Sequence, residues 1–131
     1  MTIRWAIVGP GAIAHNYADG LAQCQSGKLV AVCGRDPTRL AAFGKDYGLA
    51  ADRQFGDLDA MLRDPEIDAV YISTPHPWHA ELSVRALRAG KHVLCEKPAG
   101  MSAAEVVAVT EVAAQEARFF MEAVMYRCHP Q

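Results

Sequence analysis

The sequence has no long hydrophobic run, no excess of either charge, and no cysteine pair at metal-ligand spacing. None of its apolar stretches approaches the ~20 residues that a membrane-spanning helix requires, so no membrane association is expected. Thirteen lysines and arginines against fifteen acidic residues give a net charge of −2, which argues against a nucleic-acid partner. The first residues enter a short apolar segment without the basic head and longer apolar core of a signal peptide. We therefore expect a cytoplasmic globular protein.

The four cysteines are scattered along the chain as Cys24, Cys33, Cys95 and Cys128, and none belongs to a C-x-x-C pair. Because no cysteines and histidines cluster at ligand spacing, no metal site is expected. Cys33 and Cys95 lie inside apolar segments, which is typical of reduced, buried thiols in a cytosolic protein. The length of 131 residues fits one domain, and no internal repeat or interdomain linker divides it.

Short apolar segments alternate with segments of helical periodicity along the whole chain. The apolar segments are expected to be strands and span residues 3–8, 29–33, 68–73, 92–95 and 119–123, whereas residues 51–56 fit a short strand or a loop. Helix starts are marked by Asp36-Pro37 and by a capping box from Ser102 to Glu105. Strand–helix alternation with continuously apolar strands is typical of a parallel sheet covered on both faces. The predicted fold class is therefore α/β, with a doubly wound, mostly parallel sheet.

A glycine-rich turn, Gly9-Pro10-Gly11-Ala12-Ile13-Ala14, follows the first expected strand. In this G-x-G-x-x-A pattern, Gly9 permits a tight turn and Gly11 lets a pyrophosphate approach the backbone. The helix that follows offers free N–H groups to the phosphates, so Ala12 and Ile13 join the expected cofactor contacts. The same sequence pattern also occurs in glycine turns that serve only packing. Here, however, the turn lies within a β-α-β unit, which predicts a Rossmann dinucleotide-binding domain.

The residues at the end of the second strand predict which dinucleotide binds. NAD-binding folds usually place Asp or Glu about 20 residues beyond the glycines, but Gly34 and Arg35 stand there in this chain. No carboxylate is present to bind a ribose 2′-hydroxyl, and the guanidinium of Arg35 can pair with a 2′-phosphate. NADP is therefore favoured over NAD. The alternative is that Asp36 binds the ribose, although Asp36 is expected to cap the helix that Pro37 begins.

Two further polar segments follow expected strands, namely residues 73–79 and Glu96-Lys97-Pro98. The carboxyl ends of parallel strands meet at one edge of the sheet, which places both segments beside the glycine turn. A lysine ammonium at that edge can stabilise alkoxide charge or transfer a proton as hydride moves. An ordinary Lys97 paired with Glu96 at a strand end fits the same position. His76 and His79 have no identifiable carboxylate partner, which favours polar loop groups over acid/base catalysts.

Together these motifs resemble the glucose–fructose oxidoreductase / inositol dehydrogenase (Gfo/Idh/MocA) family. The resemblance lies in the glycine turn, in Ser73-Thr74-Pro75 with His79, and most specifically in Glu96-Lys97-Pro98 after residues 89–95. Residues 120–127 are most similar to the dihydrodiol dehydrogenase and xylose dehydrogenase branch, which generally uses NADP. The resemblance covers essentially the whole chain.

The family resemblance also implies a set of site residues. Lys97 would be the catalytic residue, beside the nicotinamide and the reacting oxygen of the substrate, with Glu96 beside the nicotinamide ribose. The remaining implied cofactor contacts, from the Thr-Pro loop and the chain after the last strand, are Ser73, Thr74, Pro75, His76, His79 and Arg127. Many family members have Asn at the position of His76. The full enzyme would transfer hydride to or from a carbon bearing oxygen in a small-molecule sugar or diol.

A second domain is the last implication of the resemblance. Residues 1–123 are expected to form the dinucleotide-binding domain, and residues 124–131 to begin the crossover to a substrate domain that this chain lacks. That domain usually carries the dimer interface, so a homo-oligomer is expected, and the isolated chain is expected to be inactive. The alternative function is a non-catalytic nucleotide-binding or interaction module.

Overall fold

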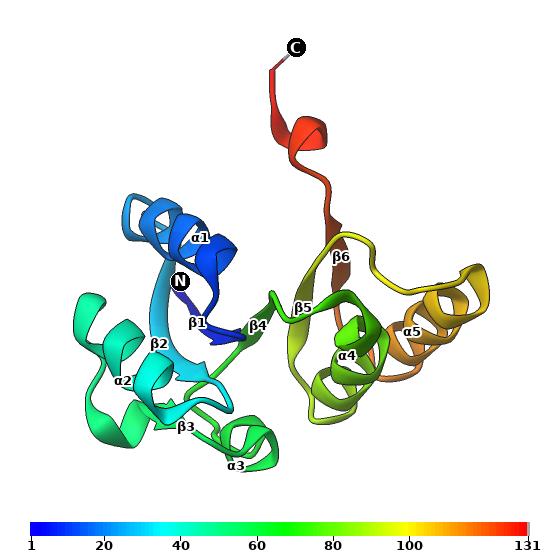
Figure 1. The fold of residues 1–131 in the computed structure, drawn as a ribbon. Helices are drawn as coiled ribbons and strands as arrows, with labels where there is room; N and C mark the ends of the chain where they lie inside the picture. The colour runs from blue at the N-terminus through cyan, green and yellow to red at the C-terminus, as the bar shows by residue number, and fades with distance from the viewer. Residues whose placement is uncertain (131) are drawn as a thin grey trace.

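A computed structural model describes residues 1–130, which form a six-stranded sheet flanked by helices (Figure 1). The strand order is β3-β2-β1-β4-β5-β6, and all five strand pairs are parallel. This is the order of the two halves of a Rossmann domain, which confirms the predicted fold class. The strands are β1 (Ile3–Val8), β2 (Gly27–Cys33), β3 (Gln54–Phe55), β4 (Ala69–Ile72), β5 (His92–Glu96) and β6 (Phe120–Ala123).

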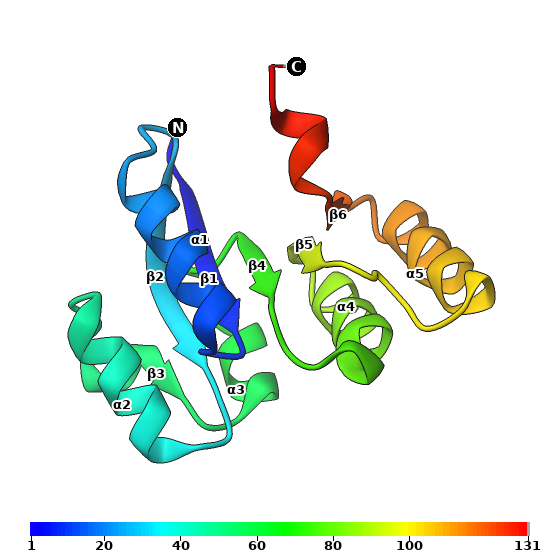
Figure 2. The same cartoon turned by 45° about the horizontal axis from the view of Figure 1, so that its top comes forward.

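The helices cover the sheet from two sides (Figures 1 and 2). One apolar cluster packs α1 and α2 against the sheet, and a second cluster packs α3, α4 and α5 against the opposite face. Neighbouring residues of β1 show the division, because Ala6 and Val8 belong to one cluster and Ile7 to the other. The strands are continuously apolar for this reason. The helices are α1 (Ala12–Ala22), α2 (Pro37–Asp46), α3 (Leu58–Leu62), α4 (His79–Arg88) and α5 (Ala103–Gln115).

The helices α2 and α5 begin at the residues that the capping patterns of the sequence predict. The Asp36 side chain accepts hydrogen bonds from the backbone N–H groups of Thr38 at 2.9 Å and Arg39 at 3.1 Å, which confirms the predicted cap of α2. At α5, Ser102 accepts from the N–H of Glu105 at 3.3 Å. The Glu105 carboxylate, however, accepts from the N–H one residue before the cap, at 2.7 Å, so the predicted capping box is only half formed. None of the helices within residues 1–130 is long and apolar enough to cross a membrane.

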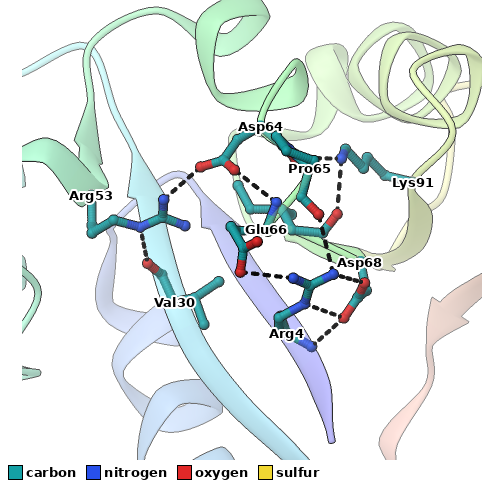
Figure 3. A network of polar contacts seen from close by, with 9 residues as sticks. Arg4, Val30, Arg53, Asp64, Pro65, Glu66, Asp68 and Lys91 are labelled. Carbon is teal, nitrogen blue, oxygen red and sulfur yellow. Dashed lines mark hydrogen bonds and ion pairs between the residues drawn. The ribbon is translucent and has the colours of Figure 1, made fainter.

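A polar network ties the amino ends of β1 and β4 together (Figure 3). The Arg4 guanidinium donates to both carboxylate oxygens of Asp68, at 2.7 and 2.9 Å, and to Glu66 at 2.8 Å. The backbone N–H of Arg4 adds a further bond to Asp68 at 2.8 Å. Because the Arg4 guanidinium donates to it, the pKa of Asp68 falls to about 2, despite the opposing effect of burial.

Lys91 extends this network to the amino end of β5. It is 7% exposed, and its ammonium donates to the backbone carbonyl oxygens of Asp64 at 2.7 Å and Ile67 at 2.8 Å. Arg53 forms an ion pair with the Asp64 carboxylate at 2.6 Å. The loop between α3 and β4 is therefore fastened at the amino ends of the strands (Figure 3). The glycine turn lies at the other end of β1, after Val8.

We expect the Arg4–Asp68 pair to make the protein acid-sensitive. The depressed pKa of Asp68 adds stability above about pH 4, and this contribution is lost as the pH falls towards 2. The Asp68 side chain is 36% exposed, so screening limits the contribution to about 1 kcal/mol. Urea unfolding should therefore show Asp68→Asn less stable than the wild type at neutral pH, with a difference that vanishes at low pH. Glu111→Gln, at an exposed position, is the control, and a pH-independent difference at Asp68 would contradict the prediction.

Candidate functional site

The glycine turn and the loop after β4 are joined directly. Ser73 donates from its hydroxyl to the carbonyl oxygen of Gly9 at 2.8 Å, and from its backbone N–H to Val8 at 2.9 Å. Gly9 has a φ of +95°, and an added Cβ would lie 3.0 Å from the backbone nitrogen of Thr74. Both the conformation and the close approach therefore require glycine at this position.

The start of α1 is open where a pyrophosphate would approach. No atom lies within 4 Å of the place that a Cβ of Gly11 would take, and no side chain caps the first turn, which begins at Ala12. The Thr74 hydroxyl oxygen nearby is buried and has no hydrogen-bond partner among the residues that the structure describes. An open glycine, uncapped N–H groups and an unpaired hydroxyl fit the phosphates of a dinucleotide.

A cavity of about 620 Å³ extends from this turn past the end of β2 to α4. Arg35 and Arg39 line it, both exposed, and neither forms an ion pair within residues 1–130. Asp36 also lines it, but one of its carboxylate oxygens already accepts the two capping bonds. The cavity therefore offers two free guanidinium groups to an anion. Its other walls include Pro10, Leu58, Pro75, Trp78, Glu81, Leu82 and Arg85.

Position 34 cannot carry a side chain in this arrangement. A Cβ added to Gly34 would lie 2.7 Å from the ring Cδ of Pro10. The proline ring is bonded to its own backbone nitrogen and cannot swing away as a flexible side chain does. The glycine turn and the end of β2 are thus packed against each other where an NAD-binding fold places its ribose-binding acid.

A second cavity, of about 650 Å³, lies between α1, the loops after β4 and β5, and the chain after β6. The predicted residues that line it are Ile13, Ser73, Thr74, His76, His79, Glu96 and Lys97. Lys97 is exposed and Glu96 is half-buried. Arg127, in the short 3₁₀ turn after β6, is exposed and lines neither cavity.

His79 links the loops that follow β4 and β5. It is fully buried, and its Nδ1 lies 2.7 Å from the carbonyl oxygen of Pro98 while its Nε2 lies 2.8 Å from that of Thr74. Both ring nitrogens are thus directed at backbone oxygens, and the imidazole fastens the Lys97 loop to the loop that borders both cavities. The bond between Lys97 and Pro98 is cis.

Burial keeps two ionisable groups at the site in their neutral form, the Cys33 thiol and the Tyr71 hydroxyl. Burial raises the pKa of the Cys33 thiol to about 11, so this wall of the first cavity is neutral and supplies no thiolate. Burial and the neighbouring Glu96 carboxylate also raise the pKa of Tyr71, whose hydroxyl donates to Glu96 at 2.6 Å.

Within residues 1–130, no three His, Cys, Asp or Glu side chains come together as a metal site.

Three residues of the site were not predicted from the sequence. Arg39 lies in the first turn of α2, three residues after the predicted cap Asp36, and this place beside the end of β2 was the available signal. Trp78 is 47% exposed on the wall of the first cavity, and its place beyond the Thr-Pro loop was the available signal. Tyr71 lacked such a signal, because its contact with Glu96 depends on the register of β4 and β5.

The comparisons with known proteins agree with this geometry. Residues 3–124 match the family described as an oxidoreductase family with an NAD-binding Rossmann fold. The chain belongs to the Gfo/Idh/MocA oxidoreductase family. An uncharacterized oxidoreductase of Rhizobium meliloti, ORF334, is 38% identical over 98% of the chain, and trans-1,2-dihydrobenzene-1,2-diol dehydrogenase of Mus musculus is 36% identical over 99%. The chain spans 38% and 39% of the length of these two relatives.

Solved structures of family members have the same fold. The 3-ketoreductase KijD10 from Actinomadura kijaniata, in complex with NADP and TDP-benzene, is 32% identical with a TM-score of 0.93. The match covers all of this chain and 40% of KijD10. The WlbA dehydrogenase from Chromobacterium violaceum, in complex with NADH and UDP-GlcNAcA, is 29% identical with a TM-score of 0.90, over 96% of this chain and 36% of WlbA. The two proteins were solved with different nicotinamide dinucleotides, so this Gfo/Idh/MocA chain has an NAD(P)-binding Rossmann fold.

Proposed function

We propose that this chain is the NADP-binding domain of an oxidoreductase that acts on an oxygen-bearing carbon of a sugar or diol. The observation that carries the proposal is the first cavity, where Arg35 and Arg39 are unpaired and Gly34 leaves no room for a carboxylate. The substrate class is supported by the names of the relatives, a diol dehydrogenase and a ketoreductase solved with a TDP ligand. Bound NADP(H) would supply or accept the hydride.

Each part of the site has a distinct task in this proposal. The free N–H groups of Ala12 and Ile13 would bind the pyrophosphate, and Gly11 would let it approach the backbone, helped by the unpaired Thr74 hydroxyl. Arg35 would pair with the 2′-phosphate through its fork of donors. Arg39 would add a second positive charge, while Asp36 remains the cap of α2.

Lys97 would act on the substrate oxygen from the second cavity. Its ammonium can donate a proton to an alkoxide as a carbonyl is reduced, and take one from a hydroxyl in the reverse direction. The positive charge also stabilises the oxygen as it becomes negative. Glu96, His76 and His79 border the same cavity and would contact or fix the nicotinamide half.

The domain boundaries are part of the proposal. Residues 1–123 would form the dinucleotide-binding unit, and residues 124–130 lead away from the sheet after β6 (Figure 1). They would begin the crossover to a substrate domain, with Arg127 near its entrance. Residue 131, which was included in this crossover, lies outside the described residues.

Calorimetry with the 131-residue chain tests the proposal. NADPH and 2′,5′-ADP should both bind, and NADH should bind more weakly. Binding of NADH but not of 2′,5′-ADP would contradict NADP selection, and binding of neither dinucleotide would favour the alternative of an interaction module.

We expect the isolated chain to associate and to be inactive with sugar aldehydes or diols. Met125 is 80% exposed and Tyr126 71% exposed beside the half-buried Val124, and contiguous apolar surface of this kind tends to find a partner. Light scattering should show a dimer that Met125→Glu weakens, whereas Met101→Glu, at a site 58% exposed in the loop before α5, leaves it unchanged. A monomer at high concentration would refute the predicted association. NADPH oxidation that depends on added sugar would refute the predicted inactivity.

A further inference from the structure

Tyr71 is a buried tyrosine whose hydroxyl contacts Glu96, a residue that lines the second cavity. It lies on β4, is 2% exposed, and packs in the apolar cluster beneath α1. In the register of β4 and β5, Tyr71 is the partner of Leu94, so Glu96, two residues further along β5, is its diagonal neighbour on the same face. The hydroxyl donates to Glu96 Oε1 at 2.6 Å.

The second carboxylate oxygen of Glu96 is held as well. The backbone N–H of Lys97 donates to Glu96 Oε2 at 3.3 Å. One donor therefore comes from the neighbouring strand and the other from the residue that carries the candidate catalytic ammonium. With one oxygen on each donor, the carboxylate can rotate only by breaking a hydrogen bond.

The tyrosine is itself fixed by its surroundings. Tyr17 of α1 stacks on the Tyr71 ring with centroids 3.9 Å apart and an angle of 14° between the planes. Burial and the Glu96 carboxylate raise the pKa of Tyr71, so the hydroxyl remains a donor at neutral pH. Tyr17 offers a comparison, because its own hydroxyl makes no hydrogen bond within the described part of the chain.

We propose that Tyr71 is a positioning residue that orients the Glu96 carboxylate and, through it, the backbone at Lys97. The proposal rests on the proposed function of the same site, because the Glu96 and Lys97 side chains are taken to serve the nicotinamide half. Without the Tyr71 hydroxyl, Oε1 loses its donor, and the carboxylate turns away from the Lys97 amide towards water. The adenine half, at the first cavity, stays unchanged.

Two substitutions that each remove one tyrosine hydroxyl test the proposal. Tyr71→Phe and Tyr17→Phe both keep the stacked rings, but only the first removes a donor from Glu96. We expect Tyr71→Phe to weaken NADPH binding roughly tenfold and to leave 2′,5′-ADP binding unchanged, while Tyr17→Phe changes neither. In NMR spectra, the Lys97 amide should move upfield and exchange faster in Tyr71→Phe alone. In a Glu96→Ala background, Tyr71→Phe should have no further effect.

The outcomes separate this proposal from the proposed function. If the two tyrosine variants give the same Lys97 amide signal, Tyr71 does not position that residue. Equal loss of NADPH and 2′,5′-ADP binding in Tyr71→Phe would indicate general destabilisation and would also overturn the proposal. If the wild type binds neither ligand, the proposed function fails, and the Lys97 amide still decides the role of Tyr71.

Discussion

Replacing Lys97 with methionine is expected to lower turnover about a hundredfold to ten-thousandfold in a full-length enzyme that carries this domain. Methionine keeps the unbranched stem but can neither transfer a proton nor stabilise an alkoxide. Lys97 is exposed at the second cavity, so its charge adds little to cofactor binding, and NADPH affinity should change less than about fivefold.

The measurement is steady-state oxidation of NADPH with a carbonyl substrate, alongside cofactor binding by fluorescence. Lys45→Met, in the last turn of α2 and away from both cavities, controls for the loss of a surface charge. Near-normal turnover with collapsed NADPH affinity would make Lys97 a binding residue instead.

Arg35→Ala is expected to reduce NADPH affinity roughly tenfold to a hundredfold and to leave NADH affinity nearly unchanged. The guanidinium is exposed at the first cavity without an ion pair among the described residues, so no carboxylate has to be released when a phosphate binds. Arg39→Ala should have a smaller effect in the same direction, because Arg39 supplies only the second charge.

Calorimetry with both dinucleotides checks the arginine prediction. Arg88→Ala, in the last turn of α4 and outside both cavities, is the matched loss of an exposed arginine. Equal NADPH and NADH affinities in the wild type, unchanged by Arg35→Ala, would remove the basis for NADP selection and return attention to Asp36.

The parts of the fold that depend on near neighbours were predictable from the sequence. Apolar runs and turn residues placed the strands, and Asp36-Pro37 placed the start of α2, because caps act over three residues. Glu105 departs from expectation because its carboxylate accepts from the backbone N–H of the residue before the cap. The sequence does not indicate whether this N–H or that of the cap residue itself is the donor.

Contacts between residues on different strands and loops could not be predicted from the sequence. The Tyr71–Glu96 bond needs the register of β4 against β5, and the His79 bridge needs the path of two loops. The sequence identified the glycine turn, Arg35 and Lys97 separately as candidate site residues. Only the structure shows that Arg35 lines the first cavity and Lys97 the second.

The contact between Pro10 and Gly34 has a consequence for how cofactor choice can evolve or be engineered. A mutation that installs aspartate at position 34 drives its Cβ into the Pro10 ring before the new carboxylate can reach a ribose. A lone Gly34→Asp change therefore costs stability and gains no selectivity, while a lone Pro10→Ala change makes room that nothing uses. An acid can therefore be introduced at the end of β2 only by two coordinated substitutions, one at Gly34 and one at Pro10, because neither change alone gives a carboxylate that fits.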